Sequence, residues 1–363
     1  MRGAKFALQV IFSATLLVLF FSCRRQSVAE NPVANKQESG DTILYQPLFA
    51  DGFTAYKTQN GDTILKTSDG SFFVKEDFKK SAYIASSPAL AFWNAAGALD
   101  SVSFSSSRPE SWENQKIASA IREKKILYCG KYSAPDYELL ASENCTLAIE
   151  SLMITHAPEV KEKLEALGIP VFVDRSTLEK NPLGRLEWIV AHGILSGHFK
   201  EALAVFNSQL ELISSIQKSE SKNQNEKKSV AFFFVNAEGQ AVVRSDDGYF
   251  SNMISLAGGL PVQLGKSEDV SLNLSIEELY ALSKDADFIV YNATVTSPLK
   301  TKSELLEKSP LFKDFVAVKN DSVWTTTKAL HQSPEKTGEI ILEISQMLSE
   351  NQKSDFIFLE KSK

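Results

Sequence analysis

The stretch from Ile126 to Trp188 decides the fold of this chain. It begins ILYCGKYSAPDYELLASENCTLAIES and ends KLEALGIPVFVDRSTLEKNPLGRLEW. Short apolar runs of strand length alternate with segments of helical pattern, and Gly168 stands where a helix is expected to end. This alternation predicts a parallel sheet, whose ligands bind at the carboxyl ends of the strands. Polar and aromatic residues follow the predicted strands, so we expect a binding surface there.

The second half of the chain repeats this alternation. Four strands are predicted there, at Val230–Val235, Phe288–Tyr291, Phe315–Val318 and Val323–Thr326. Between the halves, apolar residues recur at helical spacing over Phe199–Gln217, which predicts one unbroken helix. The expected fold class is therefore α/β, with two lobes that are each a mostly parallel sheet flanked by helices, joined by one long backbone helix.

The predicted elements divide the chain into six parts. An antiparallel hairpin with an Asn60-Gly61 turn opens the first lobe, and a polar, charged run at Lys218–Lys228 separates the two lobes. The parts are a signal peptide over residues 1–22, a flexible tether over 23–41, an N-terminal lobe over 42–197, a connecting helix and linker over 198–227, a C-terminal lobe over 228–351 and a tail over 352–363.

The first residues have the pattern of an export signal. Arg2 and Lys5 precede an apolar stretch, Phe6–Phe21, which has signal-peptide length and is short for a membrane span. Ser22 and Cys23 come next, and a small residue before a cysteine is how bacterial lipoprotein signals end. We expect cleavage before Cys23 and a lipid on it, which would hold the protein to a membrane outside the cytoplasm, in the periplasm or at the cell surface. A transmembrane anchor ending in a chance cysteine is the alternative.

Composition narrows the possible functions. The chain has 363 residues, 43% of them hydrophobic, and a formal net charge of −6, as expected of a soluble globular body. No block of Lys and Arg accompanies aromatic residues, so we expect no nucleic-acid partner. Cys129 and Cys145 remain after the signal; an oxidising compartment permits a disulfide between them, and two buried unpaired thiols are the alternative.

Six stretches, in their order and spacing, give the chain a family resemblance. They are Gly130–Glu138 (GKYSAPDYE), Ala166–Val173 (ALGIPVFV), Pro182–Trp188 (PLGRLEW), Leu256–Gly259 (LAGG), Asp285–Tyr291 (DADFIVY) and Ala317–Trp324 (AVKNDSVW). The chain resembles the periplasmic substrate-binding proteins of iron-complex and cobalamin ABC importers, in the class with a single backbone helix (class III). The resemblance extends from Ser81 to Leu348.

The resemblance implies a lipid-anchored receptor that captures an iron complex between its lobes. A ferric siderophore or similar chelate is the expected ligand, and the permease of an ABC importer is the expected partner. The resemblance further implies a monomer with no covalent cofactor. Haem or cobalamin is the alternative ligand, and a surface interaction lipoprotein that no longer transports is the alternative function.

The same resemblance assigns a role to two glutamates. In the family, one acidic residue on each lobe docks into arginines of the permease. Glu138 and Glu277 match these positions, with Glu278 as a near alternative. Two charges at a fixed separation give register and orientation to such a contact. The other interpretation is that both simply stabilise the dipole at a helix start.

The ligand site is expected in the loops at the strand ends, where aromatic rings offer contact area and arginines match carboxylates. The N-terminal lobe offers Ser86, Ser87, Trp112, Tyr132, Ser133, Met153 and Arg175. The C-terminal lobe offers Asn236, Arg244, Tyr249, Phe250, Asn292, Thr294, Trp324 and His331. For Trp112 and Trp324 the alternative is packing, and for Arg175 it is a salt bridge inside its lobe. His331 is either a haem ligand or a surface residue.

No catalytic motif accompanies these residues. The sequence contains no GxSxG, no HExxH and no phosphate-cradling GxxxxGK[ST]. Only four histidines occur, and His192 and His198 fall on the helical segment between the lobes. A receptor for free metal ions needs three or four converging ligands, so the sequence disfavours one. We expect a binding protein without covalent chemistry and without a protein metal site.

Overall fold

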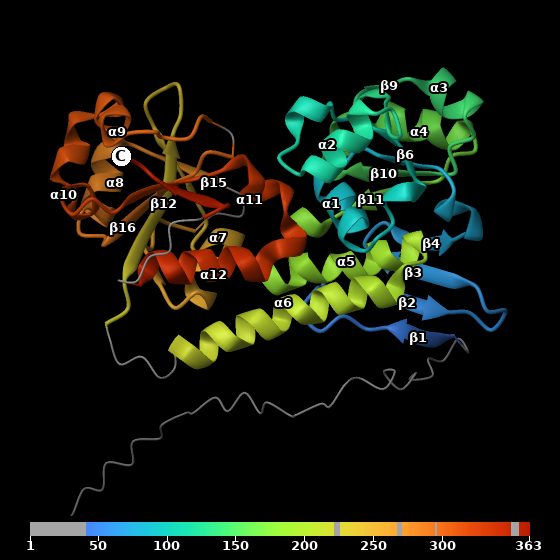
Figure 1. The fold of residues 1–363 in the computed structure, drawn as a ribbon, viewed down its shortest axis with the longest axis horizontal. Helices are drawn as coiled ribbons and strands as arrows, with labels where there is room; N and C mark the ends of the chain where they lie inside the picture. The colour runs from blue at the N-terminus through green and yellow to red at the C-terminus, as the bar shows by residue number, and fades with distance from the viewer. Residues whose placement is uncertain (1–40, 221–225, 267–270, 295, 350–355) are drawn as a thin grey trace, which may run out of the picture. The chain divides into compact units, whose positions relative to one another are not determined.

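The computed structural model describes residues 41–220, 226–266, 271–294, 296–349 and 356–363, all within one compact unit (Figure 1). The predicted signal peptide, the lipidation site at Cys23 and residues 23–40 of the predicted tether lie outside the described residues. Among the helices that are described, none is long and apolar enough to cross a membrane.

The N-terminal lobe is built on a five-stranded parallel sheet. Its strands are β5 (Ala82–Ile84), β6 (Val102–Ser105), β7 (Leu127–Tyr128), β10 (Leu147–Ser151) and β11 (Val171–Asp174), in the order β11-β10-β5-β6-β7. The predicted parallel sheet is confirmed, because every neighbouring pair runs parallel. The carboxyl ends of all five strands therefore lie at one edge of the sheet.

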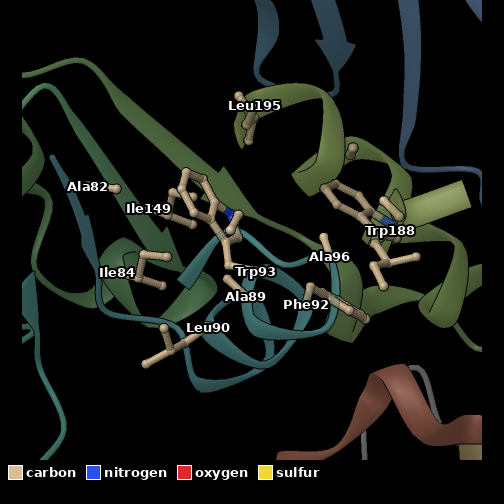
Figure 2. Close-up of a cluster of buried hydrophobic side chains, with 14 of the residues drawn as sticks. Ala82, Ile84, Ala89, Leu90, Phe92, Trp93, Ala96, Ile149, Trp188 and Leu195 are labelled. Atoms are coloured by element: carbon tan, nitrogen blue, oxygen red, sulfur yellow. The ribbon is translucent and has the colours of Figure 1, made fainter. Parts of the chain in front are cut away.

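Helices cover both faces of this sheet. The core on one face includes side chains of α1 (Ser87–Ala95), α2 (Gln115–Arg122) and α5 (Pro182–Ser196), and the core on the other includes those of α3 (Tyr137–Ser142) and α4 (Pro158–Ala166). Figure 2 shows the first core, in which Phe92 and Trp93 of α1 and Trp188 and Leu195 of α5 are buried. Burial on both faces explains why the strands are almost continuously apolar.

A second, antiparallel sheet precedes the parallel one. Four consecutive strands form it in order: β1 (Thr42–Tyr45), β2 (Phe53–Lys57), β3 (Thr63–Thr67) and β4 (Gly70–Val74). The predicted hairpin is confirmed as β2–β3, and Gly61 in its turn has a φ of 85°, a conformation that favours glycine. The sequence did not predict β4, which extends the hairpin by one strand.

Two buried glutamates attach this antiparallel sheet to the rest of the lobe. The carboxylate of Glu187 on α5 accepts a hydrogen bond from the Tyr45 hydroxyl at 2.6 Å and from the backbone N–H groups of residues 48, 49 and 50 at 2.7 to 2.8 Å. Glu179 accepts from the backbone N–H groups of Asp51 and Gly52 and from Nε1 of Trp188. The loop between β1 and β2 has no ladder for these N–H groups, and the two carboxylates satisfy them instead.

The predicted backbone helix is present as α6 (Phe199–Glu220). It is separate from α5, because Gly197 adopts a left-handed conformation with a φ of 77° and ends α5. α6 packs along α5 and along α12 (Thr337–Leu348), and the Gln209 side chain accepts two backbone N–H groups at the start of α12. α6 contributes side chains to a core in each lobe, so it holds the lobes together.

The C-terminal lobe has a mixed sheet. Its strands are β12 (Ser229–Val235), β13 (Ala241–Arg244), β14 (Leu260–Pro261), β15 (Ser271–Leu274), β16 (Phe288–Tyr291), β17 (Val323–Thr326) and β18 (Leu359–Lys361). The order is β15-β13-β12-β16-β17-β18, with β14 beside the start of β12. The central strands β12, β16 and β17 are parallel as predicted. β13, β15 and β18 pair antiparallel to their neighbours, with β15 and β18 at the edges of the sheet.

Helices again lie on both faces of the sheet. α7 (Tyr249–Leu256), α12 and the end of α6 contribute to the core on one face, and α8 (Ile276–Ser283), α9 (Lys302–Lys308) and α10 (Val316–Lys319) to the core on the other. α11 (Lys328–Gln332) comes after β17 and leads through a 3-10 turn at Pro334–Lys336 into α12. The chain thus passes from the end of β17 directly to the helix that packs on α6.

Two predictions for the C-terminal lobe are wrong. The strand predicted at Phe315–Val318 is largely the helix α10, because a short buried apolar run fits a strand or a helix equally well. The predicted tail at residues 352–363 is corrected for its last residues, because Leu359–Lys361 forms β18 beside β17. Glu343 of α12 holds this end by accepting the backbone N–H groups of residues 357, 358 and 359.

Replacement of Glu187 by alanine should loosen the antiparallel sheet. The change leaves four donors without an acceptor, so we expect the free energy of unfolding to fall by at least about 3 kcal/mol. Chemical denaturation measures this loss, and limited proteolysis should show earlier cleavage in the loop between β1 and β2. The matched control is Glu201→Ala, an exposed position on α6. A Glu187→Ala protein as stable as the control would contradict the role given to this carboxylate.

Glu150 of β10 is a buried acid that lacks a hydrogen-bond partner. Its side chain is 0% exposed, and neither carboxylate oxygen is bonded to any of the described residues. The hydroxyl of Tyr83, within electrostatic reach on β5, is also buried and unbonded within the described part of the chain. Burial raises the pKa of Glu150 to about 8, so the folded protein holds this side chain protonated at neutral pH.

The raised pKa of Glu150 predicts a stability that declines as pH rises. The folded state binds this proton more tightly than the unfolded state, whose glutamate pKa is 4.5, so stability is greatest below 4.5 and is lost as pH rises through about 8. We expect the melting temperature to fall over this range, and to fall less in Glu150→Gln. Glu162→Gln, at an exposed position on α4, is the control. Equal slopes in all three proteins would show that Glu150 does not titrate in this range.

Candidate functional site at the lobe junction

The two lobes touch through polar side chains close to strand ends. Lys180, which lies after β11, pairs with Asp247, which lies after β13; the Nζ–Oδ2 distance is 2.8 Å. The carbonyl of Lys180 accepts a hydrogen bond from Nδ2 of Asn252 on α7 at 3.1 Å. The side chains of Lys180 and Asp247 are largely accessible, so their contact can break and re-form in water.

A second polar contact joins the lobes at another pair of strand ends. The side chain of Gln332, on α11 after β17, donates through Nε2 to the carbonyl of Ser111 at 2.6 Å. Its Oε1 accepts the backbone N–H of Glu113 at 3.1 Å, in the segment after β6. We define the lobe junction by the residues of these contacts and by the cationic and aromatic side chains around Arg185: Ser111, Glu113, Lys180, Arg185, Arg244, Asp247, Tyr249, Asn252 and Gln332.

Arg185 brings a positive charge to the lobe junction. It lies near the start of α5, and its guanidinium carbon is 3.7 Å from the ring centre of Tyr249 on α7, in the other lobe. Its Nη2 donates to the carbonyl of Thr177 at 2.8 Å, but its Nε is buried and has no acceptor among the described residues. Burial lowers the pKa of Arg185, because the protein around the guanidinium disfavours its charged form.

Arg244 adds a second cation near the first. It ends β13 and is half-buried. Burial lowers its pKa, and the positive charge of Arg185 lowers it further. Within the described part of the chain, no ion pair involves either guanidinium. The two arginines therefore leave a net positive charge at the lobe junction, next to the face of Tyr249.

An aromatic cluster continues from Tyr249. Tyr249 and Phe250 meet edge to face with ring centres 5.4 Å apart, and Phe250 stacks on Phe232 of β12 at 4.4 Å. Tyr249 and Phe250 are half-buried, so their rings combine packing with accessible surface. The structure thus brings together three of the predicted ligand residues, Arg244, Tyr249 and Phe250, at one place in the C-terminal lobe.

The N-terminal lobe offers a few predicted residues with accessible side chains at its strand ends. Tyr132 and Ser133 form the turn between β8 (Gly130–Lys131) and β9 (Ala134–Pro135); Tyr132 is half-buried and Ser133 exposed. Met153 lies after β10 and is 48% exposed, and Ser87 is half-buried at the start of α1. These side chains remain available to a ligand.

Ser86 is instead part of a buried network inside its lobe. Its hydroxyl donates to Asp174 at 2.9 Å and accepts the N–H of Ala89 as the cap of α1. Burial alone would raise the pKa of Asp174, but the nearby His192, whose Nε2 is 3.7 Å from Oδ1, and hydrogen bonds from Ser176 and Ser86 lower it. Because the aspartate lies between the serine and the histidine, no nucleophile–base pair of the hydrolase type is formed by these residues.

Both predicted cleft tryptophans lie in cores. Trp112 is 4% exposed and belongs to the core of the N-terminal lobe, and Trp324 is 3% exposed in the C-terminal lobe, with its ring centre 5.1 Å from that of Phe356. Both tryptophans therefore pack in a core, which is the alternative to ligand contact stated for them above. Each indole N–H is buried without a partner among the described residues.

Arg175 and Asn236 are engaged within their own lobes. Arg175 forms an ion pair with Asp69 in the β3–β4 turn, with Nε 2.7 Å from Oδ2. Asn236 closes the β12–β13 hairpin, where its Oδ1 accepts the N–H of Gln240 at 2.8 Å. The salt-bridge alternative for Arg175 is what the structure shows.

The remaining predicted residues lie after β16 and β17. Asn292 is 1% exposed, and its Oδ1 accepts both the N–H and the hydroxyl of Thr294, so the two residues bind each other. His331 is an exposed residue of α11, next to the Gln332 contact. Although the residue is exposed, the protein around its ring and the charge of Lys328 lower the pKa of His331, so it is neutral at pH 7.

The two predicted docking glutamates are exposed on different lobes. Glu138 lies in the first turn of α3 and Glu277 in the first turn of α8. Glu278 is used differently, because its carboxylate accepts from the backbone and side chain of Ser275 in a capping box. The structure therefore favours Glu277 over Glu278 as the accessible acid of that helix.

Two further features bear on metal chemistry. Cys129 and Cys145 are buried and not joined in a disulfide, and burial raises the pKa of each thiol to about 11. Among the described residues, no group of three or more His, Cys, Asp or Glu side chains is placed to hold a metal ion.

The sequence prediction missed Arg185, and it also missed the residues of the polar contacts at the lobe junction: Ser111, Glu113, Lys180, Asp247, Asn252 and Gln332. Arg185 stands in the quoted stretch PLGRLEW, after the strand that ends at Asp174. Two signals were present: its position after a strand–loop unit, and a positive charge near a helix start, where the helix dipole disfavours cations. Its contact with Tyr249 joins residues 64 positions apart, which no local pattern reveals.

Curated proteins named as lipoproteins are similar to this chain. It is 25% identical over 239 residues to an uncharacterized lipoprotein of Methanocaldococcus jannaschii, covering 65% of this chain and 56% of that protein. A second lipoprotein of that organism is 26% identical over 211 residues, covering 57% and 53%. The chain thus matches only about half the length of these curated relatives.

Solved structures share the fold. A periplasmic binding protein of Veillonella parvula aligns with a TM-score of 0.62 at 18% identity, covering 80% of this chain and 96% of that one. The periplasmic haem-binding protein HutB of Vibrio cholerae aligns at 0.59 and 17%, covering 72% and 98%. A protein of an Fe3+-hydroxamate transport system from Saccharomonospora viridis aligns at 0.56 and 19%, covering 76% and 94%. A model of the periplasmic binding protein family matches residues 102–330, more than half of the chain, and the chain therefore belongs to that family.

Proposed function

We propose that this protein is a lipid-anchored, extracytoplasmic substrate-binding protein that captures an iron complex between its lobes and delivers it to an ABC importer permease. The family is that of periplasmic binding proteins, and the curated relatives are named lipoproteins. The pattern around Cys23 supports the anchor. The protein acts as a monomer, with a small-molecule metal complex as its ligand and no covalent step.

The observation that carries this proposal is the contrast between two kinds of contact between the lobes. α6 and α12 hold the lobes through apolar cores, whereas the strand ends meet through the Lys180–Asp247 pair and the Gln332 side chain. Exposed polar contacts of this kind are worth about 0–1 kcal/mol. Such lobes can part slightly at the strand ends to admit a ligand and close again, while the helices keep their arrangement.

The residues at the strand ends suit a large, partly flat ligand. Tyr249, Phe250 and Tyr132 offer aromatic surface, and Arg244 offers a hydrogen-bonding fork for an acidic group. A preformed chelate brings its own metal ligands, so it needs no cluster of metal-binding side chains from the protein. Haem and cobalamin are the alternative ligands, because aromatic surface serves them equally.

The test is a titration of the purified protein with ferric siderophores, haemin and cobalamin. Intrinsic tryptophan fluorescence reports binding of each, and the absorption spectrum adds the Soret band for haemin. We expect saturable quenching by at least one ferric chelate, with a dissociation constant in the micromolar range or tighter, about −8 kcal/mol. Binding of haemin or cobalamin alone would assign the alternative ligand. Absence of binding by all three classes would refute the proposal.

Glu138 and Glu277 are proposed as the contacts to the permease. Both carboxylates are exposed, stand on different lobes and have no hydrogen bond or ion pair among the described residues. Paired charges at a fixed separation orient a partner of opposite charge more than they add affinity. A permease with a basic residue opposite each lobe would fit this arrangement.

Charge reversal at the two glutamates separates transport from simple surface binding. In Glu138→Lys and Glu277→Lys we expect uptake of the ligand into cells to fall about tenfold in each, and further in the double variant, because attraction becomes repulsion. Ligand affinity in the purified variants should stay at the wild-type value. Glu143→Lys and Glu307→Lys, exposed glutamates of the same lobes, are the controls. Unchanged uptake in the double variant would favour a surface interaction lipoprotein that no longer transports.

A further inference from the structure

The positive charge at the lobe junction is only partly compensated by the protein around it. Arg185 has a buried Nε without an acceptor, and the half-buried Arg244 lies near enough for the charge of Arg185 to lower its pKa. Among the described residues, neither guanidinium forms an ion pair. Two desolvated cations close together raise the free energy of the folded state unless an anion joins them. Because Arg185 and Arg244 belong to different lobes, an anion bound by both would lie between the lobes.

The nearest carboxylates are already committed to other donors. Asp174 and Glu179 both attract Arg185 electrostatically. Asp174 accepts from the Ser86 hydroxyl and the Ser176 N–H, and Glu179 from Asp51, Gly52 and Trp188. They therefore compensate part of the charge of Arg185 from a distance and leave its Nε unbonded.

The surroundings of Arg185 hold its side chain in place. Its Nη2 is bonded to the carbonyl of Thr177, which fixes one edge of the guanidinium, and the ring of Tyr249 covers one face at 3.7 Å. A guanidinium oriented in this way can offer its remaining donors to a carboxylate or a catecholate oxygen without a further cost of ordering. Tyr249 in turn presents aromatic surface next to the same anion.

We infer that Arg185 and Arg244, together with Tyr249, form an anion-binding subsite that selects iron chelates with a net negative charge over neutral ones. This inference rests on the proposed function and narrows its ligand class. Carboxylate and catecholate chelates carry the required charge on oxygen. A neutral ferric hydroxamate and cobalamin would leave the buried Nε of Arg185 and the half-buried Arg244 without a counter-charge. Arg185 acts here as a specificity-determining residue that the sequence motif alone did not indicate.

The experiment compares ferric chelates of different charge on the full-length protein in mild detergent. The probes are ferric citrate and the ferric complex of 2,3-dihydroxybenzoate, which are anionic, and ferrichrome, which is neutral. Titration by tryptophan fluorescence and calorimetry is repeated at several salt concentrations. Inorganic phosphate serves as a competitor, to show whether any small anion fills the subsite.

The variants are Arg244→Gln, Arg185→Gln and Arg185→Lys, with Arg122→Gln as the control at an exposed position on α2. We expect Arg244→Gln and Arg185→Gln to weaken the anionic chelates about 10- to 100-fold, the loss that accompanies a missing charge-assisted hydrogen bond. Ferrichrome affinity should change little, and the salt dependence for the anionic chelates should become shallower. Arg185→Lys should recover part of the affinity, because it keeps the charge and loses the fork.

The outcomes separate this inference from the proposed function. If the anionic chelates bind in preference to ferrichrome and the arginine variants remove that preference, the inference holds. If ferrichrome binds as tightly as the anionic chelates, or the variants weaken all chelates equally, the subsite does not select charge, although the protein remains a chelate receptor. If no chelate binds, the proposed function fails first. Because Arg185 also bonds the loop at Thr177, Arg244→Gln decides the matter should Arg185→Gln unfold.

Discussion

The N-terminal lobe depends on a carboxylate buried inside it. Glu187 of α5 is 0% exposed, yet it accepts four hydrogen bonds, three of them from consecutive backbone N–H groups of the loop between β1 and β2. A buried charge is tolerated only when such donors surround it. Each N–H contributes partial positive charge, so the group resembles an anion-binding nest closed by the protein's own side chain. The antiparallel sheet is attached to the parallel one at this point.

The same device recurs at the other end of the chain. Glu343 of α12 accepts the N–H groups of residues 357, 358 and 359, which lead into the edge strand β18. Burial raises the pKa of Glu343 while these N–H groups act to lower it, as expected for an acid held partly out of water. In both lobes a glutamate on a helix beside α6 thus fixes an irregular terminal segment. These buried carboxylates contrast with the exposed Lys180–Asp247 pair between the lobes.

Apolar periodicity and the order of the elements were enough to predict most of the framework. The parallel sheet of the first lobe, the helix that spans the lobes and the strands β16 and β17 all carry a pattern that burial imposes directly on the sequence. Phe315–Val318 was predicted wrongly, because its few apolar residues suit either kind of element. The edge strands β15 and β18 were missed because they carry few buried residues, and their partners β13 and β17 lie far along the chain.

The binding residues were harder to predict, for a physical reason. Polar side chains at strand ends often form the hydrogen bonds of their own loops and are then not free for a ligand. Ser86 caps a helix, Asn236 closes a turn, and Arg175 forms an ion pair. The type of a loop residue therefore does not indicate whether its side chain is free to bind a ligand. A candidate binding residue is marked instead by a buried polar atom without a partner, such as the Nε of Arg185, which lies beside Tyr249 with no acceptor among the described residues. This arrangement of Arg185 and Tyr249 forms only after both lobes have folded, because the arginine and the aromatic ring come from different lobes.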